Sequence, residues 1–288
     1  MIILFGSTGY IGSEFAKQLA ELKIPVFLWP NTKNTTFKDL EKWYDEAGYP
    51  LIGAAINVAG YTGKPNVDAC EFDKAGTIHG NIVWPQILTD WCMLNDIPLG
   101  HVSSGCIYEG RRSDGTPFTE EDEPNFSFKY GNCSFYSGTK VIAESIVSKW
   151  EKSYNWRLRI PFDEYNNPRN YLTKINKYNL LLDAENTISN KQEFVSACIQ
   201  TITKKVPYGI YNVTNGGSIT TKQVTEMISK TISPGKIFNF VGEEEFYKNV
   251  VKTPRSNCVM SNEKLLSTGI KMRNAEEAMW HCLNNWIV

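Results

Sequence analysis

The sequence predicts an α/β fold with a doubly wound parallel sheet that is covered by helices on both faces. The run Met1–Phe5 is short, continuous and apolar, as expected of a strand buried inside a parallel sheet. A glycine-rich segment follows it directly, and strand-like and helix-like patterns then alternate through the first half of the chain. With 288 residues, of which 42% are hydrophobic and 21% charged, the chain can bury a large core.

The first strand leads into a turn that carries three glycines. Gly6, Gly9 and Gly12 begin a segment whose apolar residues recur at helical spacing as far as residue 22. In a dinucleotide-binding turn, successive glycines permit the tight bend, the approach of a pyrophosphate and the close packing of helix on strand. The N–H groups at the start of the helix then face the phosphates. An ordinary strand–helix turn is the alternative. The cofactor-binding residues predicted here are Gly6, Thr8, Gly9, Tyr10, Ile11 and Gly12.

The second predicted strand, 24–29, indicates which dinucleotide binds. Folds that prefer NAD usually carry Asp or Glu near the end of this strand, where the carboxylate accepts a hydrogen bond from the ribose 2′-OH. Here Trp29 is followed by Pro-Asn-Thr-Lys, without an acid. The missing acid and the nearby Lys33 lead us to expect NADPH, with NADH as the alternative cofactor. We assign Lys33 to the 2′-phosphate, and we name Asn31 as a further cofactor-binding residue. The alternative for Lys33 is an ordinary solvated lysine.

The remaining elements fit the same architecture. Further strands are expected at 52–58, around 99–102 and at 157–161, and amphipathic helices at 77–94 and 135–150. The second half of the chain is more mixed. There we expect a strand at 209–214, helices at 221–231 and 275–286, and loops with short elements between residues 166 and 190.

The domain organisation follows from this change of pattern. We predict an NADP-binding domain over residues 1–162, with a returning segment at about 187–214. A smaller mixed α/β region for substrate binding is predicted over 163–186 and 215–288.

Two segments carry reactive side chains. Ser104 and Cys106 come directly after the apolar strand that ends at Val102. Tyr136 and Lys140 stand four residues apart in a predicted helix, which places them on one face. A lysine beside a tyrosine stabilises the tyrosinate and so makes Tyr136 a usable general acid. Taken alone the pair is common by chance, but together with the glycine-rich turn it indicates a reductase site.

These motifs occur in the order and approximate spacing of a known family. The chain resembles the extended short-chain dehydrogenases/reductases, which have a Rossmann fold. Within them it is similar to the plant-type nucleotide-rhamnose synthase epimerase/reductases. The segments that carry the resemblance are Asn57–Asp68, Ser104–Ile107, Glu120–Asp122, Pro124–Phe126, Asn167–Asn170, Thr173–Lys174 and Pro254–Asn257.

The resemblance implies a bifunctional 3,5-epimerase/4-reductase that uses NADPH. Its substrate would be a nucleotide-linked 4-keto-6-deoxyglucose, with UDP as the first choice and dTDP left open, and its product the nucleotide-linked L-rhamnose. Cys106 and Lys174 would share the epimerase chemistry, in an order that stays open. Ser104 and Tyr136 would hold the C4 oxygen, and Lys140 would hold the nicotinamide ribose.

Further residues are assigned to binding. Ala59, Gly60 and Ile160, together with Tyr136 and Lys140, are predicted to contact the cofactor. Thr62, Asn81, Arg169, Asn170 and Arg255 are predicted to contact the substrate, although Arg169 and Arg255 could instead form surface ion pairs. The other six cysteines are expected to be structural. The three histidines lack metal-ligand spacing, so no metal is expected.

One departure from the family concerns the origin of the substrate. Related 4,6-dehydratases carry Asp-Glu where this chain has Gly105-Cys106, so we expect a separate 4,6-dehydratase to supply the keto sugar. Three alternative functions remain: a 4-reductase without epimerase activity, an enzyme similar to GDP-fucose synthase, and a non-catalytic NADP-binding regulatory subunit.

Composition limits the partners and the compartment. Thirty Lys and Arg against 31 Asp and Glu give a net charge of −1, which argues against nucleic acid as a partner. No apolar run is long enough for a membrane span, and no basic segment precedes the first apolar run as in a signal peptide. Seven cysteines without a C-x-x-C pair indicate a reducing compartment. We therefore expect a cytoplasmic enzyme and, from the resemblance, a homodimer.

Overall fold

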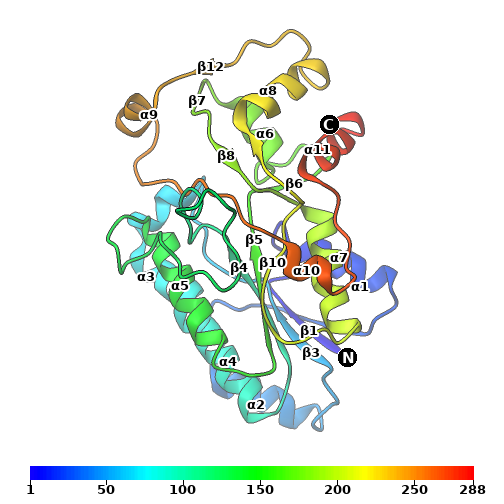
Figure 1. Ribbon diagram of the computed structural model, residues 1–288. Helices are drawn as coiled ribbons and strands as arrows, with labels where there is room; N and C mark the ends of the chain where they lie inside the picture. Colours follow the sequence, from blue (N-terminus) through cyan, green and yellow to red (C-terminus); the bar gives the residue numbers. More distant parts are fainter. The chain divides into compact units, whose positions relative to one another are not determined.

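The computed structural model describes all 288 residues. It divides into two compact units (Figure 1). We call the first the sheet unit; it comprises Met1–Ser104, Phe135–Arg157 and Cys198–Tyr211. We call the other the second unit; it comprises Gly105–Ser134, Leu158–Ala197 and Asn212–Val288. Compactness does not reveal what each unit binds, so the predicted NADP-binding and substrate-binding parts stay predictions.

The sheet unit is built on a six-stranded sheet in the order β10-β5-β4-β3-β1-β2. β1 pairs in parallel with β2 and with β3, and β3 pairs in parallel with β4. The chain runs from β1 to one edge at β2 and then continues on the other side of β1, so the strand order reverses between β1 and β3. Open α/β sheets bind ligands outside the carboxyl ends of the strands at such a reversal. The strands are β1 (Ile2–Phe5), β2 (Val26–Trp29), β3 (Ala54–Asn57), β4 (Leu99–Ser104), β5 (Ser153–Leu158) and β10 (Gly209–Asn212).

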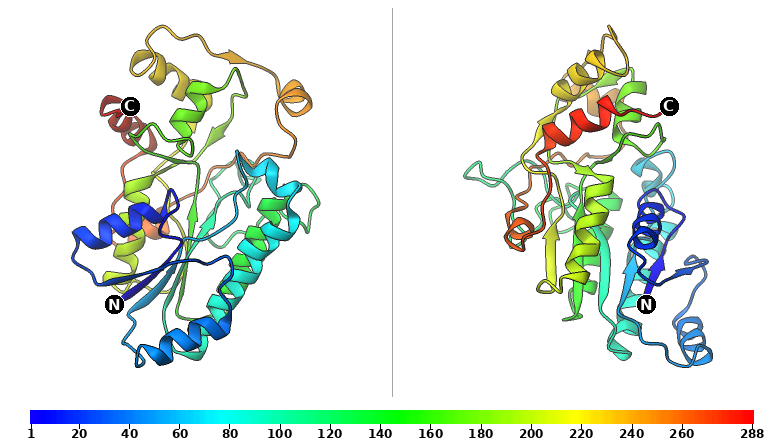
Figure 2. Two further views of the ribbon diagram at one scale, coloured as in Figure 1. Left: turned by 180° about the vertical axis from the view of Figure 1, so that it is seen from behind. Right: turned by 90° about the vertical axis from the view of Figure 1, so that its right-hand side faces the viewer.

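Helices flank this sheet, which confirms the predicted fold class. α4 and α5 lie side by side along one face, and α1 lies along the other (Figures 1 and 2). Their bounds are α1 (Gly12–Glu21), α2 (Phe37–Glu46), the 3₁₀ helix η1 (Val67–Glu71), α3 (Lys74–Ile78), the π-helix η2 (His79–Val83), α4 (Trp84–Leu94) and α5 (Phe135–Val147). The core on this face contains Trp84, Leu88 and Trp91, all nearly fully buried. Burying one such large apolar side chain contributes about 1.5–3 kcal/mol.

The second unit has short strands and a helical core. β6 pairs in parallel with β9, β7 in parallel with β12, and β8 antiparallel with β11. α6, α8 and α11 enclose apolar side chains such as Leu172, Ile228 and Met279. The strands are β6 (Pro161–Phe162), β7 (Leu180–Leu181), β8 (Glu185–Asn186), β9 (Ser189–Asn190), β11 (Ile219–Thr220) and β12 (Asn239–Phe240). The helices are α6 (Tyr171–Lys177), α8 (Thr221–Lys230), α9 (Glu243–Asn249), α10 (Glu263–Ser267) and α11 (Ala275–Asn284), while α7 (Lys191–Thr203) begins here and ends in the sheet unit.

Several elements differ by a few residues from their predicted bounds, and two differ most. The strand expected at 157–161 is β5, which begins four residues earlier at Ser153 and ends at Leu158. Asn155 and Arg157 interrupt its apolar pattern, yet both are buried: the Asn155 amide donates to Ser148 Oγ over 3.0 Å, and Arg157 forms an ion pair with Glu144. The helix expected at 77–94 is three successive helical segments with a π-turn at His79–Val83. No helix is long and apolar enough to span a bilayer.

Candidate active site

The glycine-rich turn has the geometry of a dinucleotide-binding turn at two of its three glycines. Gly6 has φ +85°, and a Cβ there would lie 2.6 Å from the backbone nitrogen of Ala59. A Cβ on Gly12 would lie 2.0 Å from the carbonyl oxygen of Gly6. A Cβ on Gly9 would meet no atom closer than 3.4 Å. Packing therefore requires glycine at the first and third positions, while the second is open to the surroundings.

A cavity of about 130 Å³ joins this turn to the end of β2. It brings the predicted residues Gly6, Thr8 and Asn31 together. Lys33 does not line it; its side chain is exposed, and its backbone N–H donates to Asn31 Oδ1 over 2.9 Å. The cavity contains no charged side chain. Its lining residues are Gly6, Ser7, Thr8, Trp29, Pro30, Asn31 and Thr32.

Hydrogen bonds from two asparagine side chains hold the loop that follows β3. Asn57 accepts a hydrogen bond from the backbone of Ala59, 3.1 Å, and from Trp84 Nε1, 3.1 Å. Asn81, which we predicted to contact substrate, is buried, and its side chain bonds both backbone groups of Tyr61 and the hydroxyl of Thr139. In the structure Asn81 therefore positions the loop that contains Ala59, Gly60 and Thr62.

The predicted reductase residues lie on β4 and α5 of the sheet unit. Ser104 is the last residue of β4 and is buried. Tyr136 and Lys140 are one turn apart on α5. Lys140 is also buried, and its Nζ donates to the carbonyl oxygen of Val102, 3.0 Å away on β4. This bond ties the face of α5 that carries Tyr136 and Lys140 to the strand that ends in Ser104.

Sequence reasoning missed a buried ion pair that continues this face. Glu144 follows Lys140 by one helical turn, and its carboxylate binds Arg157 of β5 with contacts of 2.6 and 3.0 Å. Ser103 of β4 donates to the same carboxylate over 2.9 Å. We call Ser103, Glu144 and Arg157 the helix clamp. It fastens α5 to two strands, and the i, i+4 spacing from Lys140 was the only signal in the sequence.

The predicted base Cys106 lies in the second unit beside a residue that we had not singled out. Arg159 donates from Nη1 to Cys106 Sγ over 3.0 Å and from Nη2 to Asn186 Oδ1 and to the backbone oxygen of Ser256. We call Cys106, Arg159, Asn186 and Ser256 the thiol cluster. The residue after Arg159 is the predicted cofactor residue Ile160, which has φ +38°. A β-branched residue rarely adopts this conformation, so the backbone here is held by its surroundings.

The loop that carries Cys106 is bound to the segment that follows Arg255. Gly110 donates its N–H to the carbonyl of Asn257 over 2.6 Å, and Asn257 in turn donates to Glu109 Oε2 over 2.7 Å. Ser256 Oγ donates to the carbonyl of Tyr108 over 2.5 Å. The Pro-Arg-Ser-Asn segment therefore supports the loop of the thiol, in addition to carrying the predicted substrate residue Arg255.

Lys174 lies among positive charges on α6. Burial is the main cause that lowers the pKa of Lys174, and the cations Arg169 and Arg255 lower it further. Asn170, a predicted substrate residue, is buried and begins the helix: its side chain accepts from the backbone of Leu172 over 3.0 Å. The structure thus brings Lys174, Arg169 and Arg255 together and gives Asn170 a helix-capping role.

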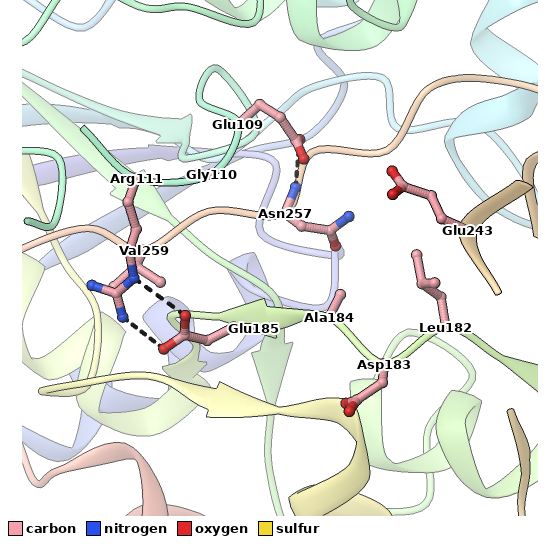
Figure 3. A pocket seen from close by; sticks show the side chains of 10 residues that line it. All are labelled: Glu109, Gly110, Arg111, Leu182, Asp183, Ala184, Glu185, Glu243, Asn257 and Val259. Atoms are coloured by element: carbon pink, nitrogen blue, oxygen red, sulfur yellow. Dashed lines mark hydrogen bonds and ion pairs between the residues drawn. The ribbon is translucent and has the colours of Figure 1, made fainter. Parts of the chain in front are cut away.

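A larger cavity of about 390 Å³ lies in the second unit (Figure 3). Arg111 and Glu185 form an ion pair of 2.6 Å at one side of it, and Glu109 points toward Asn257 at another. Burial raises the pKa of Glu109. Sequence reasoning assigned none of its lining residues, which are Glu109, Gly110, Arg111, Leu182, Asp183, Ala184, Glu185, Glu243, Asn257 and Val259. No group of three or more His, Cys, Asp or Glu side chains is arranged to hold a metal ion.

Comparison with known proteins agrees with the fold and with the motifs. The family model described as "RmlD substrate binding domain" matches residues 1–287. The chain is 31% identical over 283 residues to the bifunctional dTDP-4-dehydrorhamnose 3,5-epimerase/dTDP-4-dehydrorhamnose reductase of Arabidopsis thaliana, which covers 96% of this chain and 90% of the relative.

Two further relatives differ in how much of their own length this chain covers. The chain is 36% identical over 230 residues to the trifunctional UDP-glucose 4,6-dehydratase/UDP-4-keto-6-deoxy-D-glucose 3,5-epimerase/UDP-4-keto-L-rhamnose-reductase RHM2 of Arabidopsis thaliana. This match covers 78% of this chain but only 33% of that longer relative. The crystal structure of the L780 UDP-rhamnose synthase from Acanthamoeba polyphaga mimivirus has the same fold, with a TM-score of 0.88 at 22% identity, covering 99% of this chain and 98% of the other.

Proposed function

The chain belongs to the RmlD substrate-binding-domain family, and from this premise we propose that it is an NADPH-dependent nucleotide-sugar epimerase/reductase. It converts a nucleotide-linked 4-keto-6-deoxyglucose to the nucleotide-linked L-rhamnose. The reductase half rests on the hydrogen bond from Lys140 to β4. This bond holds the helix that carries Tyr136 and Lys140 against the strand that ends in Ser104. The bond from Arg159 to Cys106 Sγ carries the epimerase half.

The residues around the glycine-rich turn fit NADPH. Gly6 and Gly12 keep side chains away from the turn, and the adjoining cavity is lined by hydroxyl, amide and backbone groups and has no carboxylate to repel a 2′-phosphate. When bound, NADPH supplies the hydride for the C4 carbonyl carbon. Lys140 would then hydrogen-bond the nicotinamide ribose, and Tyr136 would donate its phenolic proton to the C4 oxygen. Ser104 would hold the same oxygen by a hydrogen bond.

The epimerase half uses the acidity that the C4 ketone gives to C3 and C5. Loss of a proton from either carbon leaves an enolate whose charge rests on the C4 oxygen. At one carbon the Cys106 thiolate takes the proton, forming S–H, and the Lys174 ammonium delivers a proton to the opposite face. At the other carbon the roles reverse, so both groups return to their starting states. The lowered pKa of Lys174 suits this exchange, because it eases loss of the ammonium proton.

The substrate's charged and neutral parts match different parts of the second unit. Arg169 and Arg255 are the cations proposed to bind the diphosphate. The larger cavity is lined by four acidic residues, Glu109, Asp183, Glu185 and Glu243, of which one is paired with Arg111. Such a lining disfavours phosphate and suits a neutral base and hydroxyl groups. We propose that the nucleoside occupies it, with UDP preferred over dTDP. A separate 4,6-dehydratase would make the keto sugar, and a cytoplasmic homodimer remains a prediction.

Two measurements test this function. The keto sugar nucleotide is first incubated with the protein in deuterated water without NADPH, and deuterium at C3 and C5 is followed by NMR. We expect uptake at both carbons; none would leave a reductase without epimerase activity. UDP- and dTDP-linked substrates are then each given NADPH or NADH, and the products are identified. The absence of any 6-deoxy-L-mannose product in all four reactions would refute the proposal.

Two cysteine variants test whether the thiol of Cys106 is needed for deuterium uptake. Cys106→Ala is expected to lose deuterium uptake. Cys133→Ala, which alters another partly exposed cysteine of the same unit, is expected to keep it. Equal uptake in both variants would remove Cys106 from the mechanism.

A further inference from the structure

Arg159 is a buried cation without a carboxylate partner. Only 2% of its surface is exposed, and the three groups that accept its hydrogen bonds are a sulfur, an amide oxygen and a backbone oxygen. Its Nε has no hydrogen-bond partner. Removing a charge from water costs several kcal/mol unless an opposite charge compensates it. Negative charge on a group beside Arg159 would therefore stabilise it.

Cys106 is the ionisable group best placed to do so. Its Sγ lies 3.0 Å from Nη1 and is the only titratable atom that hydrogen-bonds the guanidinium. The other titratable groups facing Arg159 are Cys258 and Glu109. Glu109 acts from a longer distance, and its carboxylate already accepts from the backbone of Asn257.

Cys258 is held in the neutral form. Its thiol is fully buried, and burial raises the pKa of Cys258. Its Sγ donates to the carbonyl oxygen of Gly105 at 3.4 Å, a bond that requires the proton. Of the two sulfurs beside Arg159, only that of Cys106 accepts a hydrogen bond from the guanidinium.

We propose that Arg159 is a positioning residue that keeps Cys106 as a thiolate and fixes the place of its sulfur. The inference rests on the proposed role of Cys106 as an epimerase base. A guanidinium holds the negative charge on sulfur through a charge-assisted hydrogen bond, which is stronger than a bond between neutral groups. Because no carboxylate is hydrogen-bonded to the guanidinium, this bond is available whenever the thiol is ionised. When Cys106 takes a proton from the sugar, an S–H bond forms and the charge passes to the C4 oxygen.

Thiol reactivity tests the inference without substrate or cofactor. Iodoacetamide reacts with thiolates, and mass spectrometry reports the alkylation of Cys106 separately from that of Cys133, which is partly exposed and serves as an internal reference. We compare the unchanged protein with Arg159→Gln and Arg159→Lys between pH 6 and 10. At pH 7 we expect Arg159→Gln to alkylate Cys106 about tenfold more slowly. At pH 10, where thiols ionise without help, the two rates should converge, and Arg159→Lys should lie between the two proteins at pH 7.

The outcomes separate this inference from the proposed function. An unchanged rate at pH 7 in Arg159→Gln, or an equal change at pH 7 and pH 10, would overturn the role of Arg159. Should Arg159→Gln fail to fold, judged by circular dichroism, Arg159→Lys decides alone: a rate equal to that of the unchanged protein at pH 7 overturns the inference, and a slower rate that recovers at pH 10 supports it. Deuterium uptake by the unchanged protein tests the epimerase independently of these rates.

Discussion

Arg157 and Arg159 stand two residues apart, are both almost completely buried, and have different partners. Arg157, in the helix clamp, binds the carboxylate of Glu144 through two nitrogens, and Ser103 completes the contact. Arg159, in the thiol cluster, bonds a sulfur and two neutral oxygens. Where the protein neutralises its own cation, the arginine holds two elements together. Where it does not, as at Arg159, we propose that the cation stabilises the thiolate of Cys106.

The two units also differ in the charge of their candidate binding residues. The cavity beside the glycine-rich turn of the sheet unit has no charged lining residue. In the second unit, Arg169 and Arg255 both lower the pKa of Lys174, so three cations gather there. A region with excess positive charge suits a thiolate and a diphosphate. Four predictions, from the largest expected effect to the smallest, test this division of roles.

Substituting the proposed reactive residue of one unit should impair reduction, and substituting that of the other unit should impair epimerisation. Tyr136→Phe removes the proposed proton donor and should lower reduction by about 10²–10⁴-fold, while NADPH binding persists. Cys106→Ala should lower deuterium uptake at C3 and C5 by a similar factor and should affect reduction of the already epimerised keto sugar much less. Stopped-flow absorbance of NADPH and NMR of the sugar measure the two steps. Equal losses of both steps in both variants would contradict separate roles for the two regions.

Breaking the helix clamp should unfold the protein more easily. Glu144→Ala leaves Arg157 buried without a counter-charge, and the free energy of unfolding should fall by about 3–5 kcal/mol. The double variant Glu144→Leu with Arg157→Met removes both charges and should recover most of that loss. Urea denaturation followed by tryptophan fluorescence measures both. A loss below 1 kcal/mol in Glu144→Ala would mean that the clamp is not a structural ion pair.

Adding a negative charge to the uncharged cavity should shift the cofactor preference from NADPH toward NADH. Asn31→Asp places a carboxylate at the end of β2, where it would repel a 2′-phosphate and accept from a ribose 2′-OH. The ratio of kcat/KM for NADPH to that for NADH should fall by about 10–100-fold, equivalent to roughly 1.4–2.8 kcal/mol. Lys38→Ala, an exposed lysine beyond the cavity, serves as the control and should leave the ratio unchanged. An unaltered ratio in Asn31→Asp would place the adenosine ribose elsewhere.

Relieving the cluster of cations should stabilise the second unit. Because the pKa of Lys174 is lower in the folded chain than its usual value, the unfolded chain binds the proton more tightly at this residue. The resulting cost is fully present below the folded pKa and diminishes as the pH rises toward the ordinary lysine value of about 10.4. Lys174→Met should therefore raise the melting temperature at pH 7, and the gain should shrink at pH 10.

An exposed lysine on the same helix provides the control for that measurement. Lys177→Met should leave the melting temperature nearly unchanged at both pH values, because its side chain is in water. A gain in Lys174→Met that is the same at pH 7 and pH 10 would indicate better packing of methionine and no relief of charge.

The sequence by itself determined the sheet architecture and the family, and it named the candidate reactive residues. Gly12 must be a glycine because it packs against the backbone of Gly6, so its spacing from Gly6 can be recognised in the sequence. The same holds for Tyr136 and Lys140, which are four residues apart on one helix. The site assignments as a set remain predictions until the variants above are measured. Local rules suffice for such motifs because neighbours in the chain are also neighbours in space.

Only the tertiary structure decided which charges are paired. Arg157 and Arg159 look alike in the sequence, and their partners lie 13 and 53 residues away. The same holds for Asn81 and Asn170, whose amides are used within the protein, and for the start of β5, whose buried polar residues conceal its strand pattern. The charge and hydrogen-bonding capacity of a side chain follow from its residue type and are therefore known from the sequence. The atoms that satisfy them come from distant segments, which only folding brings within 3 Å or so.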